Sequence, residues 1–364
     1  MRPHKYIKRI IQPIFTTGRT KEILHVNPTV QPIREEAKEI KIFIYNYDGR
    51  HLNEMQAETP EACFDFKDTN NVSWINIDGI RKKDVELICR KFGVHNLIVE
   101  DILSVGQRPK TDEIEGIMFC LLNMLYFNDR HCSVEQEQIS IVLGKNFVLT
   151  FQEDASRDVF DSLREKLRLS SSKIRHSGAD YLCYSLIDMI VDHYFVVMES
   201  LGEKIEQLEE EIIRNTNTRS LAKINSLRKE LIVLKRNVSP VRDLVNGFIK
   251  SESELLEDRT TKYFKDVYDH IVQANDLAEN YRDMMTSLQD LYLSKVNLKM
   301  NEVMKVMAVV TCLLAPATVI GGIFGMNFDI IPYAHNQWGF HVTVGFMLLV
   351  PVMMLFIFKR RGWF

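Results

Sequence analysis

The sequence predicts an α+β membrane protein, in which an N-terminal cytoplasmic α/β domain is followed by a long stalk helix that continues into the first of two C-terminal transmembrane helices. Three features predict this class. Two uncharged apolar runs lie near the C-terminus, short alternating stretches occupy the first half of the chain, and the interval before the first apolar run contains few helix-breaking residues.

The two apolar runs, Val306–Phe324 and Gly339–Phe358, contain no Asp, Glu, Lys or Arg. Each is close to the roughly 20 residues that cross about 30 Å of hydrocarbon. A buried hairpin of a large soluble protein is the alternative, but such a protein rarely places two runs of this kind in succession at a chain end. We therefore expect two spans in a lipid bilayer.

Charges around the two runs predict their orientation. The connecting stretch Gly325–Trp338 has no Lys or Arg. Basic residues precede the first run and follow the second: Lys295, Lys299, Lys305, Lys359, Arg360 and Arg361. Because basic residues favour the cytoplasmic side, we expect a multi-pass protein of the cytoplasmic membrane with both termini in the cytoplasm.

Composition describes an ordinary soluble body before the membrane, since the net charge is -3 and 26% of residues are charged. This balance excludes a nucleic-acid partner. Residues 1–35 form a basic arm, whose apolar piece Ile10–Phe15 is too short for a signal peptide. The six cysteines show no metal-ligand spacing and fit reduced thiols in a cytoplasm. The chain has no P-loop pattern and no histidine beside a nucleophile, so neither an enzyme nor an organic cofactor is expected.

A mixed α/β domain is expected over residues 36–175. Its predicted strands are Ile40–Asp48, Val72–Ile77, Ile117–Phe127, Gln138–Leu143 and Phe147–Phe151, and its predicted helices are Lys82–Phe92 and His95–Leu103.

Residues 176–300 predict a helical and stalk region. Tyr181–Ile213 has helical periodicity and an acidic face, and after a turn the basic stretch Arg219–Asn237 can pair with it. A solvated helix pair with a structural role is the preferred interpretation, and a divalent-ion or interdomain electrostatic role is the alternative. From Thr260 to Phe324 the only proline is Pro316, which permits one helix on the order of 95 Å long.

A polar stripe follows this long helix at steps of three and four residues. Its members before the membrane are Asp266, Asp269, Gln273, Asp276, Asn280, Asp283, Ser287, Asp290, Ser294, Asn297 and Asn301, at positions where a coiled coil would have apolar residues. The same spacing continues through Met304, Ala308, Thr311, Ala315, Thr318, Gly322 and Gly325, which are small or hydroxylated except for Met304.

Two interpretations explain the stripe. Close packing of small residues between helices explains the membrane half only. A ring of identical helices around a water-filled axis explains both halves, and because two spans cannot enclose a channel alone, it implies a closed homo-oligomer. Rings of Asp269, Asp276, Asp283 and Asp290 would attract cations, with Asp290 at the pore entrance, although plain solvation also explains exposed acids.

Met304 interrupts the small residues near the cytoplasmic edge of the span, and Met307 follows close to the same axis. Flexible apolar side chains there can form a gate that excludes water. Filling of gaps between helices is the alternative, chiefly for Met307.

Several motifs closely resemble the CorA family of magnesium channels. They are Glu100–Leu103 with Gln107–Lys110, Ala179–Leu182 with Ser185–Asp188, Asp266–His270, Tyr292–Ser294, Asn301–Val306, Pro316, Gly321–Phe328 (GGIFGMNF) and the tail Lys359–Phe364. The resemblance covers about residues 36–364, and a Gly-Met-Asn tripeptide between two terminal spans is its most specific part.

The resemblance implies a funnel-shaped homopentamer with a pore-lining span at 301–325, an outer loop at 326–338, a second span at 339–358 and a basic cytoplasmic tail at 359–364. Gly325, Met326 and Asn327 would form the selectivity filter, in which Gly325 permits the turn and Asn327 presents a ring of amides to hydrated magnesium. The implied pore-lining residues are Asn301, Met304, Met307, Ala308, Thr311, Ala315, Thr318 and Gly322, with Met304 and Met307 as the gate.

The resemblance also implies a regulatory divalent-cation site between subunits, formed by Asp101 and Asp266, whose occupation by Mg²⁺ would close the pore. Magnesium would thus be both transported and regulatory, in a channel driven by membrane potential. Two departures from the family weaken other features: Ala315 is small where a bulky residue is common, and Pro332 is followed by Tyr333 and Ala334 rather than an acid. Transport of cobalt, nickel or zinc is the first alternative, and a membrane-anchored structural or sensory protein is the second.

Overall fold

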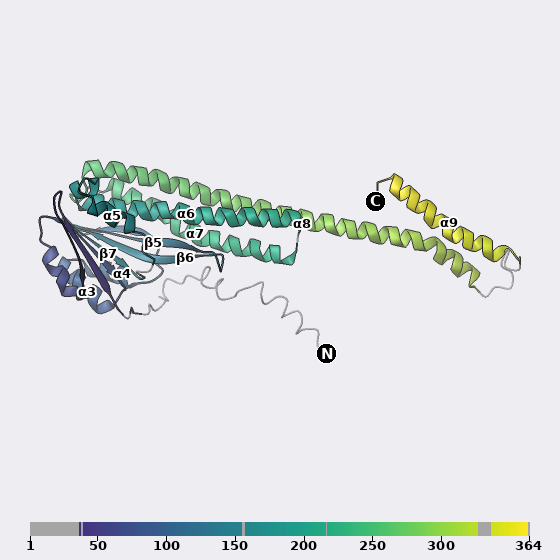
Figure 1. Ribbon diagram of the computed structural model, residues 1–364, viewed down its shortest axis with the longest axis horizontal. Coiled ribbons are helices and arrows are strands. Elements are labelled where there is room, and N and C mark those ends of the chain that lie inside the picture. The colour runs from purple at the N-terminus through teal and green to yellow at the C-terminus, as the bar shows by residue number, and fades with distance from the viewer. Residues whose placement is uncertain (1–35, 38, 155–156, 216, 327–335, 363–364) are drawn as a thin grey trace. The chain divides into compact units, whose positions relative to one another are not determined.

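The computed structural model describes residues 36–37, 39–154, 157–215, 217–326 and 336–362 (Figure 1). The predicted basic arm, residues 1–35, lies outside this range, as do Asn327 and the rest of the outer loop up to residue 335. The chain divides into two compact units, the first made of Met1–Glu211 with Asn217–Leu288 and the second of Ile212–Thr216 with Gln289–Phe364.

The first unit contains a seven-stranded sheet in the order β2-β1-β3-β7-β6-β5-β4. The strands are β1 (Lys41–Tyr47), β2 (Leu52–Ala57), β3 (Val72–Asp78), β4 (Lys110–Ile114), β5 (Ile117–Asn128), β6 (Ser133–Leu143) and β7 (Phe147–Gln152). The central pair β3 and β7 is parallel, whereas every other neighbouring pair is antiparallel. The parallel pair requires a long crossover between β3 and β7, and α3, α4, β4, β5 and β6 all lie within it.

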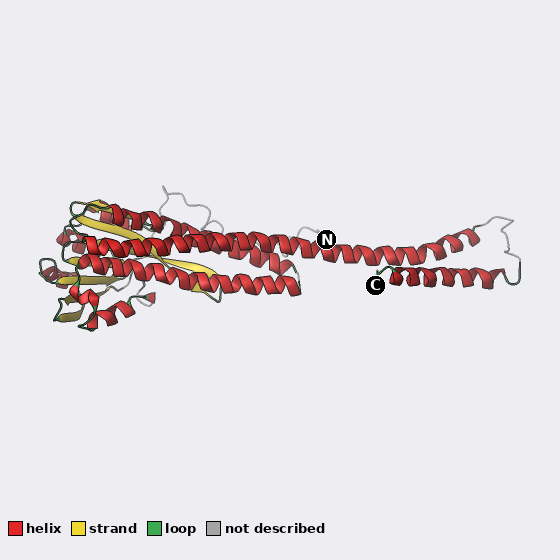
Figure 2. Ribbon diagram, turned by 90° about the horizontal axis from the view of Figure 1, so that it is seen from above, coloured by secondary structure: helices red, strands yellow, loops and turns green. Residues whose placement is uncertain are grey.

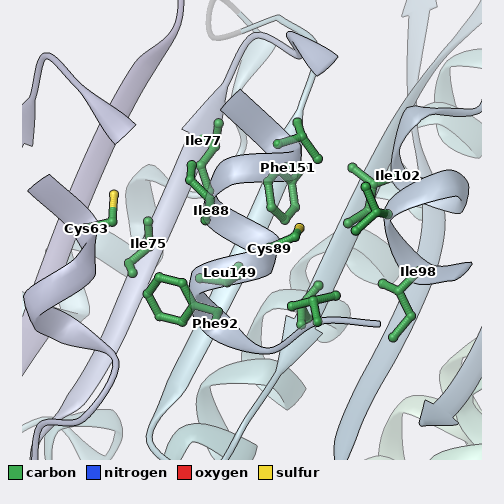
Figure 3. Close-up of a cluster of buried hydrophobic side chains, with 14 of the residues drawn as sticks. Cys63, Ile75, Ile77, Ile88, Cys89, Phe92, Ile98, Ile102, Leu149 and Phe151 are labelled. Carbon is green, nitrogen blue, oxygen red and sulfur yellow. The ribbon is translucent and has the colours of Figure 1, made fainter. Parts of the chain in front are cut away.

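One face of this sheet carries the hydrophobic core. Alternate residues of β3, Ile75 and Ile77, point to the helices α3 (Lys82–Phe92) and α4 (Asn96–Leu103) and to the short 3-10 helix η1 (Pro60–Phe66). Figure 3 shows Ile88 and Phe92 of α3 packed over these strands. Because successive strand residues point to opposite faces, the intervening residues of β3 must be covered separately.

The opposite face combines aromatic packing with a buried polar network. Trp74 stacks on Tyr45 at 5.0 Å between ring centroids and meets Phe160, which precedes α5 (Asp161–Arg168), edge-on at 6.1 Å. Asn76 donates to Asp78 at 2.8 Å and accepts from Thr150 at 2.6 Å. The buried side chains of Asn76, Asp78 and Thr150 are therefore paired, whereas the buried hydroxyl of Tyr47 has no hydrogen-bond partner among the described residues.

Three long helices complete the first unit: α6 (Ala179–Arg214), α7 (Thr218–Lys250) and part of α8 (Asp258–Phe324), with the short 3-10 helix η3 (Lys173–His176) before them. Both views show them running alongside one another (Figures 1 and 2). Lys223 of α7 pairs with Glu211 of α6, and Lys235 of α7 pairs with Glu279 of α8. The acidic and basic helices thus meet, as the structural interpretation of their charges expects.

The predicted helices α3 and α8 agree with the structure to within two residues at each end, and α7 differs most. It continues through Pro240 to Lys250 instead of ending at Asn237. Apolar residues on both sides of the proline, including Val238, Val241 and Leu244, are buried. Their burial stabilises the helix beyond the hydrogen bond that proline removes.

The second unit contains the C-terminal part of α8 and the helix α9 (Gly339–Arg360). Within the described part of the chain, three helices, α6, α8 and α9, are long and apolar enough to cross a membrane by length and composition. The apolar window of α6 is 61% buried within the protein, against 6% for α8 and 0% for α9. The apolar surface of α6 therefore has protein partners, and that of α8 and α9 is left for a bilayer or for further subunits.

Candidate functional site

The polar stripe lies on the exposed side of α8. Each of its members from Asp266 to Asn301 is exposed. The buried apolar residues occupy a different face, at steps of three and four except for one step of seven between Ala278 and Met285: Phe264, Val267, Ile271, Ala274, Ala278, Met285, Leu288 and Tyr292. The expectation that the stripe takes the positions of an apolar seam is therefore incomplete, because α8 has a separate apolar seam that packs within the first unit. The stripe itself is free to face water or another copy of the chain.

Four carboxylates on this stripe repeat every seven residues, which places neighbours about 10 Å apart along a helix. Asp269, Asp276, Asp283 and Asp290 are all exposed. Arg282 lies 3.2 Å from Asp283 and partly neutralises it.

The apolar end of α8 keeps the same surface. Met304 is 54% exposed and Met307 is 64% exposed, which is high for methionine. The hydroxyl of Thr311 donates to the carbonyl of Met307 at 2.9 Å, and that of Thr318 donates to Leu314 at 3.0 Å. Each hydroxyl proton is thus satisfied within the helix, and the oxygen lone pairs remain available to a hydrated cation.

Among the glycines near the end of α8, Gly325 and Gly321 lie close to other atoms, whereas a Cβ on Gly322 would meet nothing within 4 Å. A side chain on Gly325 would have its Cβ 3.1 Å from the carbonyl oxygen of Gly321, to which the Gly325 amide donates at 3.0 Å. Gly325 does not have a positive φ. Glycine is thus favoured here by the crowded last turn rather than by a left-handed conformation. At Gly321 a Cβ would lie 3.4 Å from Met347 Cε, so α8 and α9 are in contact there.

Asp101 lies near the end of α4, and its carboxylate is held by two donors. Lys110 Nζ lies 2.6 Å from Oδ2, and Gln107 Nε2 donates to Oδ1 at 2.9 Å. Asp266 is exposed on α8. Among the described residues, no hydrogen bond or ion pair joins Asp101 to Asp266.

A third group of possible ligands was not predicted from the sequence. Asp188 and Asp192 of α6 and His270 of α8 place one ligand atom each within 4.8 Å of one another. His270 Nδ1 lies 3.6 Å from Asp192 Oδ1, too far for a hydrogen bond. The spacing of Asp188 and Asp192 puts them on one helix face, but only the packing of α6 on α8 adds the histidine.

The electrostatics of this cluster favour a bound cation. Burial, followed by the neighbouring Asp192 carboxylate, raises the pKa of Asp188, and the Asp266 carboxylate acts in the same direction. Tyr184 donates to Asp188 Oδ2 at 3.2 Å, while Oδ1 is buried without a hydrogen-bond partner in the described structure. Carboxylates gathered in this way are stabilised by a divalent cation, and oxygen ligands suit Mg²⁺.

The fold defines a class of membrane protein that combines an α/β domain, long helices and apolar helices able to cross a bilayer. The model of the "CorA-like Mg2+ transporter protein" family matches residues 69–360. The chain belongs to this family.

Individual relatives agree with this assignment. The chain is 38% identical to the cobalt/magnesium transport protein CorA of Thermotoga maritima, over 90% of this chain and 93% of the relative. It is 26% identical to CorA of Methanocaldococcus jannaschii, over 80% of this chain and 90% of the relative. The complete structure of the Methanocaldococcus jannaschii CorA magnesium transporter superposes with a TM-score of 0.73, covering 91% of this chain and all of that one at 23% identity. That structure supports the fold alone.

Proposed function

We propose that this chain forms a gated homopentameric channel, funnel-shaped and set in the cytoplasmic membrane with both termini in the cytoplasm, that carries Mg²⁺ into the cell. The observation that carries the proposal is the exposed stripe of α8, polar before the apolar segment and small or hydroxylated within it, in a chain of the CorA-like family. Small and polar residues in a stripe are not expected on a surface that faces lipid. Five copies of α8 around an axis would line a pore with this stripe.

In this channel residues 301–325 line the pore, 326–338 form the outer loop and 339–358 form the outer ring of spans, between the helical region 176–300 and the basic tail 359–364. Asn327 presents amide oxygens to hydrated Mg²⁺ at the mouth, after the turn formed by Gly325 and Met326. Magnesium gives up its water reluctantly, so neutral acceptors that bind its water shell suit it. Asn301 and Asp290 form polar rings at the inner end.

The pore-lining residues between these ends are Met304, Met307, Ala308, Thr311, Ala315, Thr318 and Gly322. The high exposure of Met304 and Met307 in one chain leaves both side chains available for a water-excluding constriction. The membrane potential drives entry, since about 2.3 kcal/mol per unit charge per 100 mV gives about 4.6 kcal/mol for a divalent ion.

Cytoplasmic Mg²⁺ closes the pore by binding between subunits at Asp101 and Asp266. The cluster of Asp188, Asp192 and His270 adds a second cation site nearby, because its ligand atoms lie within 4.8 Å of one another and His270 follows Asp266 by one turn of α8. A bound divalent ion would relieve repulsion among these carboxylates in the closed form.

The test of the filter is Asn327→Ala, assembled and reconstituted in liposomes. Loss of amide contacts to a charged, hydrated ion is worth about 1.5–3 kcal/mol each, so Mg²⁺ flux should fall about tenfold or more. Asn336→Ala, which removes an amide three residues before α9 begins, is the matched control and should retain flux. Normal Mg²⁺ flux in a well-assembled Asn327→Ala pentamer would contradict the proposed role of Asn327 in selectivity.

The test of the regulatory site is the double variant Asp101→Ala with Asp266→Ala. Without these carboxylates, the internal Mg²⁺ concentration that halves the flux should rise at least about tenfold, because binding through a lost carboxylate costs about 1.4 kcal/mol or more. Asp65→Ala on η1 serves as the control. Unaltered inhibition in the double variant would remove Asp101 and Asp266 from the mechanism.

Transport of cobalt is the alternative with a specific observation in its favour, because the Thermotoga maritima relative is named a cobalt/magnesium transport protein. The stripe offers no His or Cys ligand before Gly325, which disfavours a soft-metal preference. A membrane-anchored structural or sensory protein would assemble without ion flux, so the same liposome measurement distinguishes this alternative from a channel.

A further inference from the structure

The Asp101 carboxylate is paired with a positively charged side chain of the same chain, Lys110. Lys110 Nζ lies 2.6 Å from Asp101 Oδ2, and the two side chains are 37% and 17% exposed. An ammonium group at this distance makes a charge-assisted hydrogen bond, roughly twice as strong as a neutral one. The Lys110 ammonium group therefore occupies the position at Oδ2 that a divalent ion would take.

Lys110 has a second partner within reach. Its Nζ lies 3.6 Å from Asp112 Oδ2, and the Asp112 side chain is 46% exposed. Lys110 and Asp112 are two residues apart on β4, so their side chains leave the same face of the strand. The ammonium group lies between two carboxylates and can move from the more buried one to the more exposed one.

The surroundings hold the backbone at Asp101 and beside Asp112 in place. The end of α4 is attached to the sheet because Gln138 Nε2 donates to the backbone carbonyl of Asp101 at 3.3 Å. Strand β4 is held through Thr111, whose hydroxyl donates to the carbonyl of Phe119 at 3.0 Å. A shift of the Lys110 ammonium therefore needs side-chain rotation only, with no rearrangement of α4 or β4.

We propose that the Lys110 ammonium group competes with a divalent cation for the Asp101 carboxylate. Lys110 leaves Asp101 when its side chain rotates and its ammonium group pairs with Asp112 instead. This deepens the proposed function, since it rests on Asp101 as a regulatory cation ligand. A divalent ion has twice the charge of the ammonium group and displaces it once its concentration is high enough. Lys110 thereby raises the Mg²⁺ concentration at which the channel closes, and Asp112 lowers it.

Three variants of the full-length channel test this proposal. Lys110→Met keeps the length of the side chain without its charge, and it should lower the inhibitory Mg²⁺ midpoint about threefold to tenfold. Asp112→Asn removes the alternative partner, and it should raise the midpoint about twofold to threefold. Lys110→Arg keeps a cation and should stay closer to the unaltered channel than Lys110→Met does.

Two readouts are used: the inhibition midpoint of Mg²⁺ flux in liposomes, and the Mg²⁺ concentration that gives half-maximal protection of the full chain from chymotrypsin. Lys145→Met, in the turn between β6 and β7, is the control for loss of a surface charge. Opposite shifts for Lys110→Met and Asp112→Asn in both readouts support the proposal, and equal midpoints in these two variants overturn it.

Asp101→Asn separates this inference from the proposed regulation. If it weakens inhibition while Lys110→Met has the unaltered midpoint, the competitor role of Lys110 is wrong and the regulatory site stands. If Asp101→Asn leaves inhibition unchanged, the regulatory role of Asp101 fails, and the role of Lys110 fails with it.

Discussion

Asp78 is a carboxylate buried in the sheet of the first unit, and its side chain is tied to neighbours on both sides. It accepts hydrogen bonds from Asn76 and Gln152, and Gln152 also donates to Asp158 at 3.1 Å. Burial raises the pKa of Asp78, and its hydrogen bonds with Gln152 and Asn76 oppose the rise. Since hydrogen-bond donors surround the carboxylate, the cost of its charge comes from lost solvation.

Asp78→Asn should therefore be more stable than the unaltered chain at neutral pH. With the folded pKa above the unfolded one, the folded state binds the proton more tightly, so stability falls as pH rises through the interval between the two pKa values. The asparagine variant cannot ionise at this position, so its stability does not fall with rising pH for this reason. Its melting temperature should exceed that of the unaltered chain by about 2–4 °C at pH 7.5. The advantage should shrink toward pH 4.

The measurement is the thermal melting of the full chain in detergent at several pH values. A constant difference between the two proteins across pH 4 to 7.5 would contradict the assignment of the cost to ionisation. Asp68→Asn, at an exposed position, is the control and should show little pH-dependent difference.

Some candidate site residues could be named from the sequence and others could not. Asp101 and Asp266 lie in motifs that resemble the family, so they could be named without coordinates. Asp188 and Asp192 are visible as neighbours on one helix face, yet His270 joins them only through the packing of α6 against α8. The pairing of Lys110 with Asp101 depends on how β4 follows α4, which no local pattern in the sequence specifies.

Among the elements, the edge strands were the hardest to predict. Strands β2 and β4 stand at the two ends of the sheet and were not expected from the sequence. Both are largely polar and partly exposed, as edge strands that avoid association often are. The first half of β6 was also missed because Glu137, a charged residue, is buried there, where it accepts from the backbone amides of Glu153 and Asp154 at 2.8 Å each.

The helix α7 supports β4 through one close contact, which gives an element-scale prediction. A Cβ on Gly247 would lie 2.4 Å from Thr111 Cγ2. The threonine methyl cannot turn away without breaking the hydrogen bond from its hydroxyl to Phe119. Gly247→Ala should therefore push β4 away from α7 and destabilise the first unit by about 1–3 kcal/mol, partly offset by the better helix propensity of alanine.

The same substitution at Gly345 of α9 is the matched control, because a Cβ there meets nothing within 4 Å. Thermal melting and the inhibitory Mg²⁺ midpoint should both change in Gly247→Ala, since β4 carries Lys110 and Asp112. Identical melting of Gly247→Ala and Gly345→Ala would show that β4 does not depend on this contact.

At the scale of the whole molecule, the sequence predicts the two C-terminal apolar helices and the continuous helix α8 well, because they depend on composition and on the absence of helix breakers. It does not specify which face of α8 packs within its own chain. The apolar seam through Phe264, Val267 and Ile271 uses one face, so the polar stripe is left for a role outside the single chain. That division of faces is the structural basis for the proposal that several chains surround an axis.

Ion-specific flux into liposomes that contain the purified full-length protein tests the central claim most directly. With an inside-negative potential, and with Mg²⁺, Co²⁺ and Zn²⁺ compared in parallel, we predict Mg²⁺ entry that grows with the potential, exceeds Zn²⁺ entry and is reduced by Mg²⁺ inside the liposomes. Absence of Mg²⁺ entry at every potential, in protein that is demonstrably assembled, would contradict the account.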